Sequence, residues 1–199
     1  QALLQQLRTD HEVAAALCRK MPMLSCKVLR EATSVVWLNA GLIAADLATL
    51  GTLGSVLPAL KMLRLVDSGW AAGPDGVQRL AEGLGAGALP ALTHFTIVVH
   101  VGDAGASALA AALGRGAMPR LKILNLDKAA IGDAGLVALA PALRRRPALE
   151  HLTLNTNPFG DEGLAALVAP LPAGALSTAT GGLKKLKVLN LRNAHITDA

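Results

Sequence analysis

The chain has 199 residues, of which 52% are hydrophobic, so it has ample apolar surface for a packed core and is not an intrinsically disordered protein. Aromatic residues make up 2% and tyrosine is absent, which leaves leucine, alanine and valine to fill that core. The formal net charge of +5 invites a nucleic-acid interface, but most of the basic residues are scattered along the sequence.

Two clusters interrupt this scatter, Arg144-Arg145-Arg146 and Lys184-Lys185. Both lie where a helix is expected to end or a strand to begin, and a helix C-terminus favours cations through its dipole. We interpret both clusters as solvated ends of elements, with a phosphate-binding patch as the alternative. Nucleic acid is therefore not expected as a partner.

The cysteines and the uncharged runs indicate an intracellular protein without membrane insertion. Cys18 and Cys26 match no metal-binding or redox spacing, so we expect two reduced thiols and a cytoplasmic location. The sequence shows no signal peptide. Uncharged runs at 83–102 and 163–182 approach membrane-spanning length, but both contain proline and glycine inside the repeat pattern described next.

A Leu-x-x-Leu-x-Leu pattern recurs along the chain and alternates apolar with other residues, as a half-buried strand does. Its copies begin at residues 33, 60, 92, 121, 149 and 186. The copy at Leu149 is the clearest, whereas the first is weakened to Thr33, Val36 and Leu38. Each copy predicts one strand with one buried face, and the recurrence predicts a repeat protein.

Helical signals follow the strands. Gly-Asp-x-Gly turns at residues 102, 132 and 160 precede leucines at helical spacing, and their aspartates are placed as N-caps or first-turn acids. Pro-x-Leu, as in Pro147-Ala148-Leu149, ends each helix and opens the next strand. We expect residues 1–32 to form an N-terminal helical segment, a degenerate preceding repeat, with a short helix over 25–32. Residues 33–199 then hold about six repeats, the last truncated, with a loop at 172–182.

These motifs resemble the ribonuclease-inhibitor-like leucine-rich repeats over residues 33–199. The resemblance implies an α/β leucine-rich-repeat solenoid, or horseshoe, with parallel β-strands on the concave face and α-helices on the convex face. Its relatives include nuclease inhibitors, receptor sensor domains, activators of small GTPases and subunits of ciliary and other assemblies. The chain departs from the family pattern at the turn asparagine, which is kept as Asn157 alone, so we expect serine, water or backbone contacts to replace it elsewhere.

Residues between the buried leucines face the concave side, and we predict that they bind a protein. Trp37 and Arg64 are of the types enriched at binding hot spots. For Trp37, the alternative that it covers an exposed edge of the core stays open, and Trp70 is expected in the core. The predicted binding residues are Trp37, Met62, Arg64, His94, Thr96, Asn125, Asp127, His151, Thr153, Asn155, Asn190 and Arg192.

No catalytic, cofactor or metal site is expected on these strands. His94 and His151 share a column two strands apart, about 10 Å, which is too far for two ligands of one zinc ion. Asp127 is the one acid in these columns and lacks a second carboxylate. The glycine-aspartate turns recur once per repeat, which marks them as structural rather than as a phosphate loop.

The sequence thus predicts a non-enzymatic scaffold for protein–protein interaction, a subunit or fragment of a larger assembly such as a ciliary complex. The alternative is a regulatory leucine-rich-repeat domain of an immune-type receptor or of a GTPase-activating protein. In the last case Arg64 would be the arginine offered to the GTPase.

Overall fold

The computed structural model describes residues 26–66, 71–169 and 183–197. One parallel sheet contains six strands in chain order, β1 (Ser34–Leu38), β2 (Met62–Val66), β3 (His94–Val98), β4 (Ile123–Asn125), β5 (His151–Thr153) and β6 (Val188–Asn190). The helical elements are α2 (Cys26–Glu31), α3 (Ala44–Leu53), the 3-10 helix η1 (Gly54–Val56), α4 (Gly73–Gly83), α5 (Gly102–Gly114), α6 (Asp133–Arg144) and α7 (Asp161–Val168).

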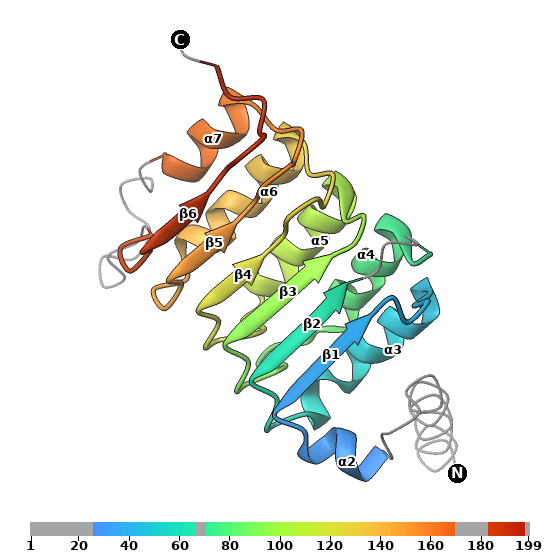
Figure 1. Cartoon of the computed structure of the whole chain (residues 1–199). Coiled ribbons are helices and arrows are strands. Elements are labelled where there is room, and N and C mark those ends of the chain that lie inside the picture. The colour runs from blue at the N-terminus through green and yellow to red at the C-terminus, as the bar shows by residue number, and fades with distance from the viewer. Residues whose placement is uncertain (1–25, 67–70, 170–182, 198–199) are drawn as a thin grey trace.

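The sheet and the helices form two layers. Figure 1 shows α3 to α7 lined up along one face of the sheet, while no helix of the described residues lies on the other face. The helix-free face is named the open face below. The predicted alternation of parallel strands with helices is confirmed, and α2 confirms the short helix expected over 25–32. Predictions for residues 1–25, Trp70 and the loop at 172–182 lie outside the described residues.

The core lies between the two layers and consists of stacked rows of leucine-pattern residues. Strand register places equivalent residues side by side, so Leu63, Phe95, Leu124 and Leu152 form one row. Each of these four side chains is at most 1% exposed. Because every repeat adds one layer to the same rows, the fold buries a continuous core made mainly of aliphatic side chains.

The register of β1 differs by one residue from the prediction. Val35 pairs with Leu63 and Trp37 with Leu65, and these two side chains are 2% and 4% exposed. A one-residue shift moves every side chain of a strand to the other face, so Val36 and Leu38 point outward. The expected core positions Thr33, Val36 and Leu38 were therefore wrong.

One buried polar side chain joins the turns after β4 and β5. Asn157 is 1% exposed, and its Oδ1 accepts the N–H groups of Ala129 and Ile131 at 3.2 and 3.0 Å. Its Nδ2 donates to the carbonyls of Leu126 and Leu154 at 2.8 and 2.9 Å. The side chain thus satisfies backbone groups of two successive turns that have no water to bond.

Backbone contacts replace this asparagine one repeat earlier. Ala129 occupies the position of Asn157, and the carbonyl of Ala129 accepts the N–H groups of Val101 and Gly102, both at 2.9 Å. Backbone substitution was one of the alternatives expected from the missing asparagines. The N–H groups of the turn after β3 are therefore satisfied, although the alanine at this position has no polar side chain.

The aspartates of the Gly-Asp-x-Gly turns stand in the first turns of their own helices, as expected, and they also bond the next repeat. Oδ1 of Asp133 accepts the N–H groups of Gly160 and Gly163 at 2.9 and 2.7 Å, which are the N-cap and the third residue of α7. Oδ1 of Asp103 accepts the N–H of Gly132 at 2.7 Å in the same way. Each carboxylate thus faces the positive end of the following helix dipole.

The second glycine of the motif makes room for this contact. A Cβ atom at Gly163 would lie 2.8 Å from Oδ1 of Asp133, and one at Gly135 would lie 2.5 Å from Oδ1 of Asp103. Both distances are below any real Cβ contact. The aspartate and the glycine three residues further on therefore act across the boundary between repeats.

Arginines form the matching contacts at the other ends of the helices. Nη2 of Arg115 donates to the carbonyls of Ala81 and Leu84, at 2.9 and 3.2 Å, where α4 ends. Arg146 donates to the carbonyls of Leu113 and Met118 after α5. Burial lowers the pKa of Arg146 from its ordinary value. We predicted that the arginine cluster at 144–146 is solvated. This prediction is correct for Arg145, whereas Arg146 is partly buried and hydrogen-bonded.

Replacing Asp133 by alanine is expected to lower the free energy of unfolding by about 2 kcal/mol, because two N–H groups at a helix N-terminus lose a charged acceptor. Urea unfolding followed by circular dichroism at neutral pH measures this loss. Asp75→Ala is the control, because Asp75 pairs with Arg79 of its own helix in an exposed salt bridge of 2.9 Å. That substitution should cost less than about 0.5 kcal/mol. Equal losses would contradict the bond between repeats.

Candidate protein-interaction surface

The open face carries three columns of side chains that run across the strands. Pairing of the strands aligns Arg64 with Val36 on one side and Thr96 on the other, and it continues this column to Asn125, Thr153 and Asn190. The columns of the open face contain eleven of the twelve predicted binding residues. Trp37 is the exception, because it points into the core.

The half of the open face over β1 to β3 is mainly apolar. Val36 and Leu38 are 43% and 59% exposed, which is unusual for neighbouring aliphatic side chains on one strand. Leu38 pairs with Val66, and Val66 with Val98, so one column is apolar across three strands. Arg64 is exposed in the middle of this group and has no ion pair among the described residues.

The half over β4 to β6 is polar, but several of its groups bond the backbone of the turns. Oδ1 of Asp127 accepts the N–H of Asn155 at 2.8 Å, and Oδ1 of Asn155 accepts the N–H of Arg192 at 2.9 Å. Oδ1 of Asn125 accepts the N–H of Asp127 at 2.9 Å. These side chains hold the strand ends together, so they offer fewer free groups to a partner than their types suggest.

The two histidines lie as their spacing predicted, with Ile123 between them in one column. Nδ1 of His94 is 2.8 Å from the hydroxyl of Thr93, which in turn donates to the carbonyl of Lys61 at 3.0 Å. His94 therefore belongs to a bonded pair on its own strand. In the described part of the chain, no three histidine, cysteine or acidic side chains gather where they could hold a metal ion.

A charge ladder crosses β4 to β6 where the strands begin. Oε1 of Glu150 is 3.2 Å from Nζ of Lys122, and Oε2 is 2.6 Å from Nζ of Lys187. The hydrogen bond from Lys187, and then that from Lys122, lower the pKa of Glu150 from 4.5 to about 2. The carboxylate is therefore charged at any pH above its depressed pKa and links three strands.

This depressed pKa makes stability depend on pH in acid. A carboxylate with a lowered pKa stabilises the fold above its ordinary pKa and loses that effect as the pH falls from 4.5 towards 2. We expect the free energy of unfolding to fall more steeply in this range for the wild type than for Glu150→Gln. Urea titrations in steps of pH measure this, with Glu162→Gln, an exposed acid of α7, as the control. Parallel curves for all three proteins would contradict the ladder.

Comparison with known proteins identifies the repeats. The family model described as Leucine Rich repeat matches residues 118–140 and 147–168. Each match covers one strand, its turn and most of the following helix, α6 or α7. These two segments are therefore similar to leucine-rich repeats, and the single parallel sheet with helices along one face has the architecture of a leucine-rich-repeat solenoid. A search among curated proteins gives no match. No helix of the described segments is long and apolar enough to cross a bilayer.

Val36 and Leu38 are the surface residues that the sequence reasoning missed. Both were assigned to the core, although a signal for the correct register was present. Ala32, Val35 and Trp37 also fit the strand pattern, and Ala32 stands 28 residues before Leu60, the same spacing that separates Leu121 from Leu149. The shifted register places two aliphatic side chains on the open face beside Arg64.

Proposed function

We propose that the chain is a non-enzymatic scaffold that binds another protein on the open face of its sheet. The observation that carries this proposal is the exposed apolar group of Val36 and Leu38 beside Arg64. Leucine-rich repeats are generally protein–protein interaction modules, and the stacking of repeats gives them an extended surface. A partner that covers these aliphatic side chains would remove them from water.

The apolar half of the face fits a protein better than a small molecule. Val66 and Val98 extend the apolar column away from the edge strand, and Met62 lies half-buried beside Arg64. Buried aliphatic residues around an arginine are typical of the centre of a protein interface, where arginine is enriched and most other charges are depleted. We infer that the partner presents apolar side chains with an acidic group opposite Arg64.

We further propose that the protein acts as a subunit of a larger assembly in the cytoplasm. The Gly-Asp-x-Gly turns and the helix after each of the strands β1 to β5 support a ribonuclease-inhibitor-like subtype, as the motifs suggested. Under this proposal the repeats begin with a degenerate unit in residues 1–32. Asn125, Asp127 and Asn155 bond turn backbone, and Arg64 lies among apolar residues, which favours binding over catalysis.

Affinity purification from extracts of the source organism, with quantitative mass spectrometry, tests the open face. Arg64→Glu combined with Thr96→Arg changes the open face, and Arg79→Glu combined with Ser107→Arg makes the same changes on the helix face. We expect the open-face variant to lose the co-purifying protein, with affinity reduced about 100-fold or more, and the helix-face variant to keep it. Thermal unfolding of both variants checks that they are folded. Retention by the open-face variant would refute the proposal.

A further inference from the structure

The edge of the solenoid where helices end and strands begin is strongly basic in its last three repeats. This strand-entry edge comprises residues 115–122, 144–151 and 183–187. It holds nine of the 19 lysines and arginines of the chain and one of its 14 acidic residues. The edge therefore carries a formal charge of +8, while the rest of the chain carries −3.

Three of these cations are used within the fold. Arg115, Arg144 and Arg146 donate to carbonyls at or after the ends of helices, as described for Arg115 and Arg146, and Arg144 bonds the carbonyl of Ala169. The other six lie on the surface, and all except Arg145 belong to the segments that lead into the strands. Helix capping does not account for these six, which are Arg120, Lys122, Arg145, Lys184, Lys185 and Lys187.

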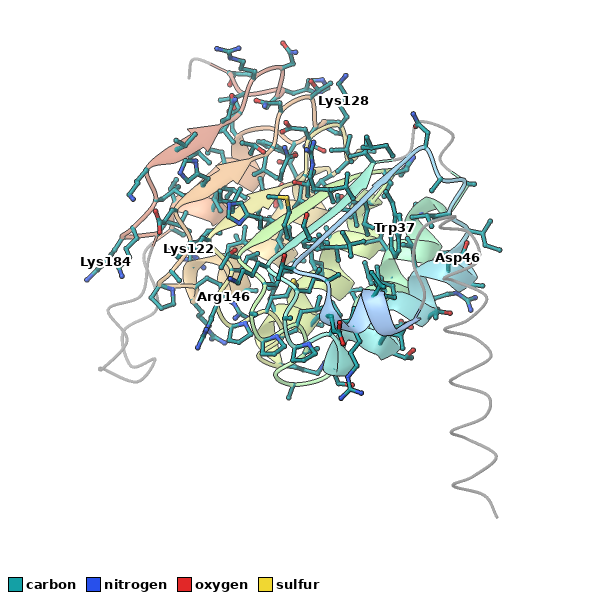
Figure 2. All side chains as sticks on the ribbon, turned by 60° about the horizontal axis from the view of Figure 1, so that its bottom comes forward. Trp37, Asp46, Lys122, Lys128, Arg146 and Lys184 are labelled. Atoms are coloured by element: carbon teal, nitrogen blue, oxygen red, sulfur yellow. The ribbon has the colours of Figure 1, made fainter. Side chains whose placement is uncertain are left out.

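The charge ladder of Lys122, Glu150 and Lys187 lies in the middle of this surface. Lys122 and Lys187 flank Glu150 on three successive strands, so their strand positions are about 10 Å apart. One carboxylate between two ammonium groups leaves a net charge of +1 in the ladder. The six surface cations and Glu150 together leave +5 on one side of the molecule. Figure 2 shows Lys122, Arg146 and Lys184 on that side, away from Lys128.

We propose that the strand-entry edge docks an acidic segment of a protein, at a surface separate from the open face. Charge complementarity sets the chemistry of the partner, because clustered cations attract carboxylates and steer their approach. Glu150 in the centre would repel a continuous chain of phosphates. A peptide with spaced acidic side chains can place one carboxylate near Lys122 and another near Lys187.

The aromatic residues also favour a protein over single-stranded nucleic acid. Single strands are held by bases that stack on exposed aromatic side chains. Of the described aromatic residues, Trp37, Phe95 and Phe159 are at most 4% exposed, so none is placed to stack on a base. The edge thus offers charge without stacking, which suits glutamate and aspartate side chains.

Fluorescence anisotropy with a labelled peptide of alternating glutamate and alanine tests the proposal on the full chain. The edge variant combines Arg120→Gln, Arg145→Gln, Lys184→Gln and Lys185→Gln. The control removes the same charge elsewhere through Arg30→Gln, Lys61→Gln, Arg79→Gln and Lys128→Gln, all at exposed residues. We expect the edge variant to lose about tenfold or more in affinity for the peptide, and the control less than about twofold. Added salt should weaken the binding of the peptide to the wild type.

Two results would overturn the proposal. Equal losses in the edge variant and the control would show attraction to net charge without a site. Tighter binding of a single-stranded or duplex oligonucleotide of equal charge would assign the edge to nucleic acid. Because both variants keep Arg64, these outcomes are independent of binding at the open face. Circular dichroism melts of both variants confirm that the folded protein is being compared.

Discussion

Replacing Trp37 by alanine is expected to lower the free energy of unfolding by about 3 kcal/mol or more, as large-to-small changes at buried aromatic residues do. The side chain is 4% exposed and lies beside Leu65 in the core row of β1 and β2. Its removal would leave a cavity at the end of the stack, where only one neighbouring strand of the described sheet can relax to fill it. Urea unfolding measured by circular dichroism gives the loss.

Leu38→Ala is the matched control for this prediction, because Leu38 follows Trp37 and is 59% exposed. We expect it to change the free energy of unfolding by less than about 0.5 kcal/mol, as surface substitutions usually do. If Leu38→Ala were the costly change and Trp37→Ala the neutral one, β1 would have the register that the leucine pattern first suggested. The pair of variants therefore decides which face of β1 is buried.

Asn157→Ala is expected to cost about 3 to 4 kcal/mol, because it leaves two N–H groups and two carbonyls of buried turns without partners. The four bonds range from 2.8 to 3.2 Å and join the turns after β4 and β5. Hydrogen exchange should show the loss locally, with faster exchange at the amides of Ala129 and Ile131. Global unfolding measurements give its size.

Asn193→Ala provides the comparison for Asn157. Its side chain is exposed and makes one long contact, 3.5 Å from Nδ2 to the hydroxyl of Thr156. Asn193 has a left-handed backbone with a φ of 55°, which alanine adopts less readily than asparagine, so we expect this substitution to cost about 1 kcal/mol and to leave the exchange of Ala129 unchanged. Similar costs for the two asparagines would mean that the turns find other partners, as the turn after β3 does through the carbonyl of Ala129.

The leucine spacing was sufficient to predict the strands, the helices and the core positions of β2 to β5, because each of these repeats buries the same positions. The spacing also predicted the strand β6, but the expected core residue Leu189 is 38% exposed there, where the described sheet ends. It was not sufficient at β1, where Val35 and Trp37 compete with Val36 and Leu38 and both registers are apolar. Hydrophobicity cannot choose between two apolar faces. The 28-residue spacing from Ala32 to Leu60 could have done so.

The hydrogen bonds between neighbouring repeats could not be predicted from the sequence. The aspartate of Gly-Asp-x-Gly stands in the first turn of its own helix, as expected, but the bonds from Asp133 to α7 were not predicted. Similarly, Arg146 was expected in solvent and bonds the end of α5. Such bonds depend on the distance between neighbouring units, which a pattern within one unit does not contain. The second glycine of the motif, which leaves room for the carboxylate, was the one feature of the sequence that indicated these bonds.

These contacts bear on function because they show which polar side chains are bonded within the fold and which remain free to bind a partner. Asp127 and Asn155 looked like binding residues and hold the strand ends together. Arg64 with Val36 and Leu38 remains available over β1 to β3. The predicted surface therefore shrinks to the apolar half of the open face and gains two residues that the pattern had placed in the core.

Site-specific photo-crosslinking tests this assignment most directly. A photoreactive amino acid is introduced at Leu38 or Thr96 on the open face, or at Ser107 or Val137 on the exposed side of α5 and α6, and the protein is irradiated in extracts of its source. We predict crosslinks to one protein from the open-face positions and none to that protein from the helix positions. Crosslinks to it from the helix positions alone would contradict binding at the open face.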